Sequence, residues 1–320
     1  MTHVAVTGAA GYIGSRVVGE LREAHPDWEL TAIDNFYLGE IREVEGVPVE
    51  HVDVRERDRL EDALAGADVV LHLAAVSGVD DCAENADLAY EVNVCGTANV
   101  AWFCRKTGAA LMFPYSMAVL GDPESFPITA DMERAPLNWY GRTKVLGERA
   151  IETMADGDEG FPATLFMISN LYGAHGIGDR TVSKGTVINF FVDRALAGEP
   201  LTVYEPGTQA RNFVHVKDVA RAFVRAATRL AERRADGDAG AVRYELATDE
   251  APSVMTVAET VRRIAREERD LDPEVRLVEN PRAGETLVDE FGVDATRIRE
   301  DLGWEPQESI EATVRELLRT

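Results

Sequence analysis

The sequence predicts an α/β protein with a doubly wound parallel β-sheet, helices on both faces of that sheet, and a smaller C-terminal lobe. Over the first 170 residues, short apolar runs rich in β-branched residues alternate with segments of helical periodicity. One run, "ADVVLHLAA" at 67–75, is almost continuously apolar, as a strand covered on both faces should be. Such alternation of strands and helices is typical of parallel sheets.

The first 35 residues predict a strand, a glycine-rich turn, a helix and a second strand. The run "HVAVTG" ends at Gly8, and "YIGSRVVGELREA" has helical periodicity until Pro26. Gly8, Gly11 and Gly14 permit a tight turn, close approach of the backbone to a pyrophosphate, and close packing of the helix on the strand. The second strand, "ELTAID", ends at Asp34, whose carboxylate can accept hydrogen bonds from the ribose hydroxyls of NAD. Together these features predict a dinucleotide site that prefers NAD to NADP.

The alternation then continues to residue 170. We expect strands at 47–54, 67–75, 110–116 and 161–170, and helices at 57–66, 88–109 and from 139 onward. Ligands of such sheets bind at the carboxyl ends of the strands. Ser116 and Asn170 close the last two of these strands, so we expect both side chains in the ligand crevice.

Tyr140 and Lys144 stand four residues apart in "NWYGRTKVLGE" (138–148), which reads as a helix. At this spacing the two side chains share one helical face. A helix with an aromatic residue near its start and a lysine on its solvated side explains the pair without chemistry. Alternatively the pair transfers protons, because a nearby ammonium favours ionisation of a phenol. The two residues alone leave both interpretations open.

Composition restricts the class of protein. A chain of 320 residues suits two lobes, and it has no long uncharged apolar run to cross a membrane. A formal net charge of -24 disfavours nucleic acid and anionic membrane as partners. Only four lysines accompany the many acidic residues, as on a salt-adapted, halophilic surface, although an ordinary acidic protein would also fit. Three widely spaced cysteines, a start without a signal peptide and scattered histidines predict a cytoplasmic protein without a metal site.

The motifs together resemble the extended short-chain dehydrogenase/reductases, and within them the NAD-dependent nucleotide-sugar epimerase/dehydratase family. The resemblance covers essentially the whole chain and rests on "TGAAGYIGS", "HVDVRE", "LHLAA", "NVCGTANV", "YSMAVLGD", "YGRTK", "SNLYGAHG", "RNFVHVKDVARAF" and "DLGWEP". It implies a Rossmann-type NAD domain with Tyr140 as the catalytic acid/base, Lys144 as its partner and as a ligand of the nicotinamide ribose, and Ser116 as the third catalytic residue. It therefore favours the chemical interpretation of the Tyr140–Lys144 pair.

The same resemblance assigns further residues to NAD and to the substrate. Asp53 would reach the adenine amine, and Asn93 would brace the strand ends from the long helix. The remaining cofactor residues that it implies are Gly8, Gly11, Tyr12, Ile13, Gly14, Asp34, Asn35, Val54, Leu73, Ala74, Ala75, Tyr140 and Lys144. The substrate residues that it implies are Ser116, Tyr140, Asn170, Arg211 and Arg282, with the two arginines near the nucleotide diphosphate. Lys184 fits either that basic patch or plain surface.

Three departures from the family pattern affect these expectations. Pro114 and Tyr115 replace serines that usually precede the catalytic one, which should alter packing and pocket shape. Met167 stands where an arginine is usual, which leaves open how Asn170 is held. Residues 117–118, Met–Ala, stand where the 4,6-dehydratases carry an Asp–Glu pair that eliminates water, so dehydration is disfavoured.

The expected reaction is therefore 4-epimerisation of a nucleoside-diphosphate sugar, with UDP-glucose and UDP-galactose as the expected pair, through a 4-keto intermediate. The alternatives are another NAD-dependent oxidoreductase reaction of the family and a non-catalytic NAD-binding regulator; Tyr140 and Lys144 weigh against the regulator. We expect an NAD domain at 1–170, with 211–248 packing back onto it, and a substrate lobe at 171–210 and 249–320. The helices at 88–106 and 139–154 are expected to form a homodimer interface to which Trp102 and Phe103 contribute, unless these two pack in the core.

Overall fold

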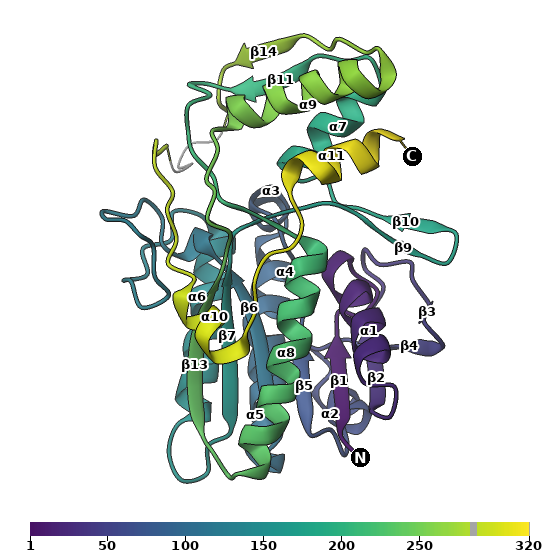
Figure 1. The fold of residues 1–320 in the computed structure, drawn as a ribbon. Helices are drawn as coiled ribbons and strands as arrows, with labels where there is room; N and C mark the ends of the chain where they lie inside the picture. The colour runs from purple at the N-terminus through teal and green to yellow at the C-terminus, as the bar shows by residue number, and fades with distance from the viewer. Residues whose placement is uncertain (282–286, 320) are drawn as a thin grey trace.

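The computed structural model describes residues 1–281 and 287–319, and within this part of the chain the largest element is an eight-stranded sheet (Figure 1). The spatial order is β13-β7-β6-β5-β1-β2-β4-β3. Every neighbouring pair is parallel except β3 and β4 at the edge. The predicted α/β class is thus confirmed. The strands are β1 (His3–Thr7), β2 (Glu29–Asp34), β3 (Glu43–Val44), β4 (Val47–His51), β5 (Val69–His72), β6 (Ala110–Ser116), β7 (Pro162–Ile168) and β13 (Gly240–Leu246).

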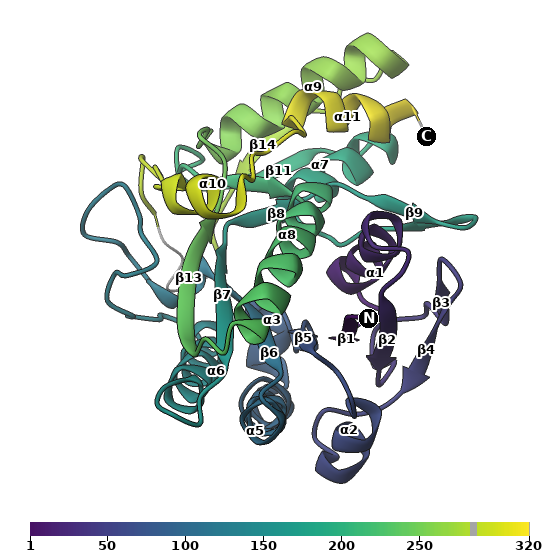
Figure 2. The same ribbon diagram turned by 60° about the horizontal axis from the view of Figure 1, so that its bottom comes forward.

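Helices cover both faces of this sheet, as Figure 2 shows. One face carries α1 (Tyr12–Ala24) and α8 (Val216–Ala235), and the other carries α2 (Arg57–Ala63), α5 (Thr97–Thr107) and α6 (Trp139–Ala155). The core is therefore in two layers. Phe223 of α8 packs on Phe166 of β7 in one layer, and Phe113 of β6 is buried in the other.

The long helix expected at 88–109 is divided into three parts. It consists of α4 (Ala86–Tyr90), a π-helical turn at Glu91–Gly96, and α5. The π turn lets Gly96 lie against Val54, where an added Cβ would be 2.6 Å from a methyl carbon of the valine. Such turns inside helices are frequent at functional sites, and this one contains Asn93. A short helix, α3 (Val79–Glu84), precedes it.

The strand predicted at 161–170 ends two residues earlier than expected. β7 stops at Ile168, and Asn170 instead begins β8 (Asn170–Tyr172), which pairs with β12 (Phe213–His215). The chain leaves the sheet because the backbone N–H and side-chain amide of Asn170 both donate to the carbonyl oxygen of Asn212. The sheet continues instead with β13, which was not predicted as a strand and pairs with β7 over its whole length.

Most of the rest of the chain forms a cap above the carboxyl ends of the strands, whereas α10 (Thr296–Leu302) lies beside β13 at the edge of the sheet (Figure 1). The cap has a core of its own, in which the apolar faces of α7, α9 and α11 meet β11. A hairpin of β9 and β10 extends from it beside α1. The remaining elements are β9 (His175–Ile177), β10 (Arg180–Val182), α7 (Val187–Leu196), β11 (Leu201–Tyr204), α9 (Val254–Arg269), β14 (Val275–Val278), α10 (Thr296–Leu302), α11 (Ile310–Arg319) and a 3₁₀ turn at Met117–Val119.

Candidate active site

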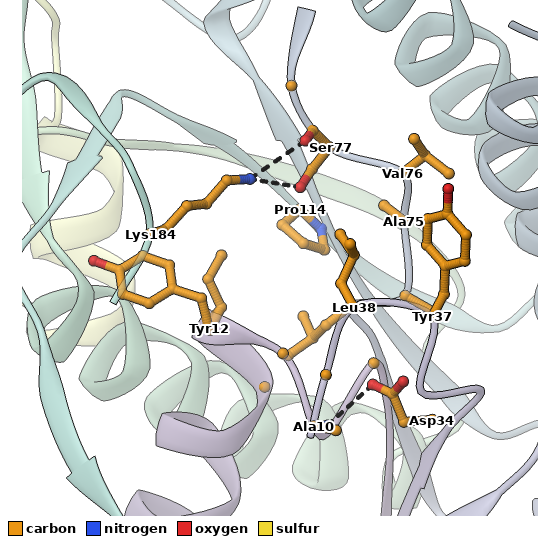
Figure 3. A pocket seen from close by; sticks show the side chains of 18 of the residues that line it. Ala10, Tyr12, Asp34, Tyr37, Leu38, Ala75, Val76, Ser77, Pro114 and Lys184 are labelled. Carbon is orange, nitrogen blue, oxygen red and sulfur yellow. Dashed lines mark hydrogen bonds between the residues drawn. The ribbon is translucent and has the colours of Figure 1, made fainter. Parts of the chain in front are cut away.

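A pocket of about 710 Å³ lies where the carboxyl ends of the strands meet the cap. This volume is within the range of small-molecule and cofactor sites. The glycine-rich turn, the ends of β2, β5 and β6, and the segment after β10 line it. Figure 3 shows Asp34 at one side of this pocket and Lys184 at the other. We call the surroundings of Asp34, Asn35 and Tyr37 the Asp34 end, and the surroundings of Ser116, Tyr140 and Lys144 the Tyr140 end.

The glycine-rich turn has the geometry of a phosphate cradle. Gly8 has a φ of +71°, and a Cβ added there would lie 2.6 Å from the backbone nitrogen of Ala74. A Cβ on Gly14 would lie 2.0 Å from the carbonyl oxygen of Gly8, so only glycine lets α1 approach β1 this closely. Gly11 is the N-cap of α1 and no side chain caps that helix, which leaves its first N–H groups for a ligand. The turn therefore fits the pyrophosphate of a dinucleotide.

At the Asp34 end, the Asp34 carboxylate is held by two backbone N–H groups. Phe36 donates to one oxygen at 2.7 Å and Ala10 to the other at 3.0 Å. Burial raises the pKa of Asp34, against the opposing effect of these hydrogen bonds and of nearby Arg42. Arg42 in turn lies over the ring of Phe36, 3.5 Å from its centroid. The carboxylate is thus oriented and faces the pocket, as recognition of a ribose requires.

Asp53 lies beside this end and outside the pocket lining. Its carboxylate accepts hydrogen bonds from Arg55 at 2.9 Å and from the side chain of Asn35 at 3.0 Å. Burial would raise the pKa of Asp53, but these hydrogen bonds outweigh it and lower that pKa to about 2. Asn35 and Val54 do line the pocket. The contact of Asp53 with an adenine stays a prediction.

At the Tyr140 end, Ser116, Tyr140 and Lys144 all line the same pocket although they come from two elements. Asn138 begins α6 by accepting a hydrogen bond from the N–H of Gly141, and this N-cap places Tyr140 and Lys144 in the first two turns. Ser116 ends β6, and its hydroxyl oxygen accepts the N–H of Ala118 at 3.2 Å.

The electrostatics at this end depend on burial. Lys144 is 4% exposed, and burial lowers its pKa to about 8. Its ammonium donates to the carbonyl oxygen of Pro114 at 3.2 Å and lies 4.7 Å from the ring centroid of Phe113. Burial also raises the pKa of Tyr140. The surroundings of Tyr140 in the protein alone therefore do not ionise the phenol. Ionisation of the phenol needs a positive charge close to its oxygen.

The residues between the two ends support the pocket wall. Leu73, Ala74 and Ala75 line it, whereas Asn93 is buried behind it. The side chain of Asn93 accepts from the N–H of Val76 and donates to the carbonyl of Val76, both at 2.9 Å. It therefore braces the segment that follows β5 and has a supporting position. Tyr12 lines the pocket and donates its hydroxyl to the carbonyl oxygens of residues 172 and 173, which joins α1 to the cap.

His72 is a core histidine, as its place in a buried strand predicts. Its ring nitrogens hydrogen-bond the hydroxyls of Thr7 at 2.8 Å and Thr97 at 3.0 Å, and burial lowers its pKa to about 3. Within residues 1–281 and 287–319, no group of three or more His, Cys, Asp or Glu could hold a metal ion. None of the described helices is long and apolar enough to cross a membrane.

The expected substrate residues are only partly brought together. Asn170 lines the pocket. Arg211 is not among the lining residues, and its guanidinium donates to the carbonyl oxygen of Ala210 at 2.8 Å. Arg282 lies outside the described residues. The role of the two arginines near a diphosphate therefore stays a prediction.

The structure also places in the pocket residues that sequence reasoning missed. These are the segment 37–41, the pair Ser77 and Gly78, and the segment 180–186 after the β9–β10 turn. They carry no motif and, apart from β10 (Arg180–Val182), they enter the pocket from loops. Lys184 is the exception: its sequence signal is that it is one of only four lysines in a strongly acidic chain.

The departures from the family pattern have a structural account. Tyr115 is buried, and its hydroxyl accepts a hydrogen bond from Arg134 at 3.2 Å. Arg134 forms a buried ion pair with Glu148 of α6 at 2.7 Å. Met167 is fully buried in the apolar core, and Asn170 is held by Asn212 rather than by an arginine there. Tyr115 thus ties β6 to α6 through Arg134, and both Pro114 and Tyr115 are among the residues that line the pocket.

Comparisons with known proteins agree with this geometry. The chain is 30% identical over 280 residues to UDP-glucose 4-epimerase 3 of Oryza sativa subsp. japonica, a match that covers 79% of this chain and 74% of that relative. It is 30% identical over 234 residues to UDP-glucuronic acid decarboxylase 1 of Danio rerio, covering 69% of this chain and about half (53%) of the relative. The fold matches the UDP-glucose 4-epimerase of Thermus thermophilus in complex with NAD, with a TM-score of 0.81, 25% identity, and coverage of 99% of this chain and 98% of that one.

The model of the NAD dependent epimerase/dehydratase family matches residues 4–239, which is most of the chain. The matched range contains the glycine-rich turn, Asp34, Ser116, Tyr140 and Lys144. The chain therefore belongs to the NAD dependent epimerase/dehydratase family and is an NAD-dependent enzyme.

Proposed function

We propose that this enzyme interconverts the C4 epimers of a nucleoside-diphosphate sugar, with UDP-glucose and UDP-galactose as its pair. The observation that carries the proposal is that Ser116, Tyr140 and Lys144 converge on one end of a pocket whose other parts fit NAD. The 4-epimerase relatives described above support it. The Met–Ala pair at 117–118 offers no acid for eliminating water, which disfavours dehydration.

Each catalytic side chain has a definite task in this proposal. Tyr140 removes the proton of the sugar hydroxyl at C4 and returns it, as a positioned acid/base. Lys144 stabilises the phenolate and holds the cofactor ribose, and Ser116 shares the hydroxyl proton with Tyr140. The cradle at Gly8–Gly14 would hold NAD, which would supply reversible hydride transfer at C4 of the sugar.

The cap supplies the substrate side in this proposal. We assign residues 1–170 and 211–248 to the NAD domain, and 171–210 and 249–320 to the substrate lobe. This division is supported by β13, which is an edge strand of the large sheet, by α8, which packs on that sheet, and by the separate apolar core of the cap; α10 departs from it by packing on β13 and α8. Asn170, Arg211 and Arg282 are proposed to bind the nucleotide sugar.

The test is product analysis. The protein with NAD is incubated separately with UDP-glucose, UDP-galactose, UDP-glucuronic acid and UDP-N-acetylglucosamine, and NMR follows the C4 configuration. We expect equilibration of UDP-glucose with UDP-galactose. Loss of a carboxyl group from UDP-glucuronic acid would indicate decarboxylation, and no change in any sugar would reject epimerisation.

We also propose a homodimer through the outer faces of α5 and α6. Trp102 and Leu146 are 42% and 44% exposed there, and such apolar exposure suits an isologous interface. Phe103, by contrast, is 4% exposed and belongs to the core, so the interface contact expected of it is wrong. Light scattering in molar KCl should give twice the mass of the chain, and Trp102→Glu should halve that mass.

The acidic surface is proposed to be a halophilic adaptation of a cytoplasmic enzyme. With a net charge of -24, self-repulsion opposes folding until salt screens it. We therefore expect the melting temperature to rise steeply from low to molar KCl. A melting temperature that does not depend on salt would reject the adaptation.

A further inference from the structure

Lys184 reaches into the pocket from the segment between β10 and α7. Its ammonium donates to the hydroxyl oxygen of Ser77 at 2.7 Å and to the carbonyl oxygen of Ser77 at 3.4 Å. Figure 3 shows the side chain extended across the pocket toward Ser77, beside Tyr12. Both Lys184 and Ser77 line the pocket. The side chain of Lys184 therefore crosses the space in which a ligand would lie.

The position of Lys184 is fixed by the cap. Asn189 of α7 is 2% exposed, and its side-chain amide donates to the carbonyl oxygen of Lys184 at 3.0 Å and to the hydroxyl of Ser183 at 3.1 Å. The oxygen of the same amide accepts the N–H of Gly173 at 2.9 Å. A buried residue thus anchors the segment that carries Lys184, which distinguishes it from a mobile surface lysine.

The charge of Lys184 has no ion-pair partner among residues 1–281 and 287–319. The surface lysines do have one: Lys106 pairs with Glu61, and Lys217 with Glu316. Lys184 bonds only the neutral Ser77, and the charge of Asp81 acts on it from beyond ion-pair distance. In a chain with 57 acidic residues, an unpaired cation in a pocket is unusual.

Lys184 and the catalytic lysine, Lys144, line the same pocket. The charge of Lys184 contributes to the lowered pKa of Lys144, after burial. Two partly desolvated ammonium groups in one pocket repel each other, and an anion between them relieves that repulsion. The Tyr140 end therefore has the electrostatics of an anion site.

We propose that Lys184 exchanges Ser77 for an anionic group of the bound nucleotide sugar and so contributes to binding of that substrate. This inference rests on the proposed function for its ligand class. The anion is either a carboxylate on the sugar, as in a hexuronic acid, or the diphosphate. Both are oxyanions that an ammonium binds by charge-assisted hydrogen bonds.

The test measures binding rather than turnover. Calorimetry measures the affinities for UDP-glucuronic acid, UDP-glucose and UDP. The two proteins compared are NAD-loaded Tyr140→Phe, which should not turn over the ligands, and the same protein with Lys184→Gln added. Lys106→Gln removes the same charge from the surface and is the matched control. Lys184→Arg keeps a cation and should preserve affinity within about threefold.

We expect Lys184→Gln to weaken binding at least tenfold. A loss confined to UDP-glucuronic acid identifies a sugar carboxylate as the partner, and an equal loss for all three ligands identifies the diphosphate. Four outcomes would each overturn the proposal. In two of them the Lys184→Gln protein binds every ligand within twofold of the Tyr140→Phe parent, or loses no more affinity than the Lys106→Gln protein. In the other two the Lys184→Gln protein loses its NAD, or the Tyr140→Phe parent itself binds none of the three ligands. Because no outcome depends on product formation, failure of the epimerase assay alone leaves the result of this test intact.

Discussion

The two ends of the pocket are built in different ways. At the Asp34 end the carboxylate is held by backbone N–H groups of Ala10 and Phe36, both close to it in the fold of one β-α-β unit. At the Tyr140 end, α6, β6 and the segment carrying Lys184 come from separate regions of the chain. The Asp34 end is thus a local structure, and the Tyr140 end is an assembly.

This difference separates two kinds of function. A local unit can keep one cofactor whatever the rest of the chain does, because its geometry is complete within about 35 residues. An assembled end changes whenever the cap changes, so we expect this end to set the substrate and the reaction. Variants at the Tyr140 end should therefore alter catalysis, and variants at the Asp34 end should alter cofactor choice.

The largest effect is expected from Tyr140→Phe. The substitution removes only the phenolic oxygen, so turnover should fall at least ~100-fold, the lower range for loss of a positioned acid/base. Folding and NAD binding should be preserved, because the aromatic ring remains. Initial rates of epimerisation and a titration with NAD measure the two quantities.

Two variants serve as comparisons. Tyr90→Phe makes the same change on the exposed surface of α4, and should leave turnover unaltered. Ser116→Ala should be milder than Tyr140→Phe, since water can replace a hydroxyl in part. A Tyr140→Phe enzyme that retained most of its turnover would contradict the assignment of Tyr140.

The next effect concerns the burial of Lys144. Burial lowers its pKa from near 10.5 to about 8, which corresponds to about 3 kcal/mol of destabilisation while the ammonium stays charged. Between pH 8 and 10.5 the unfolded chain binds the extra proton, so the free energy of unfolding rises with pH through this window. Lys144→Met removes this contribution. The stability of wild type minus that of Lys144→Met should therefore rise by about 3 kcal/mol from pH 7 to 10.5.

Urea unfolding of the two proteins without ligand, at constant molar KCl, gives this difference directly. Lys106→Met removes an exposed ammonium and controls for the change in net charge. If the free energies of unfolding of wild type and Lys144→Met ran parallel from pH 7 to 10.5, burial of the charged ammonium would not destabilise the protein. In addition, Lys144→Met should lower both turnover and NAD affinity, because the proposed role of the ammonium is to stabilise the phenolate and to hold the ribose.

The contrast between local and assembled regions also explains what the sequence could predict. The glycine-rich turn, Asp34 and the order of strands follow from spacing within short segments, and the resemblance identified the Tyr140–Lys144 pair. By contrast, β13 was missed because Arg243 and Glu245 interrupt its apolar pattern; both are used in long-range contacts, with Glu148 and the N–H of Ala130. The position of Lys184 depends on a hydrogen bond to Ser77, which lies 107 residues away in the sequence. No local sequence pattern predicts a contact between residues so far apart in the chain. Likewise the contacts of the π turn are long-range: Asn93 accepts the N–H of Val76, and Gly96 lies against Val54, so no local pattern predicts the turn.

The smallest effect is expected at the Asp34 end, from Asp34→Asn. We expect the carboxylate to repel the 2′-phosphate of NADP and to accept ribose hydrogen bonds, which contribute about 1.5–3 kcal/mol when the acceptor is charged. Its removal should narrow the preference for NAD over NADP by about tenfold to a hundredfold, and the unopposed charge of Arg42 near the same site should favour the phosphate. Titrations of Asp34→Asn and of wild type with NAD and with NADP give the ratio of the two dissociation constants for each protein.

Asp53→Asn is titrated in the same way as the matched control. Adenine is common to both cofactors, so any loss of affinity in Asp53→Asn should affect NAD and NADP equally and leave the ratio of dissociation constants unchanged. Turnover at saturating NAD should also be retained in Asp34→Asn, and a fall comparable to that of Tyr140→Phe would show that the two ends are not independent.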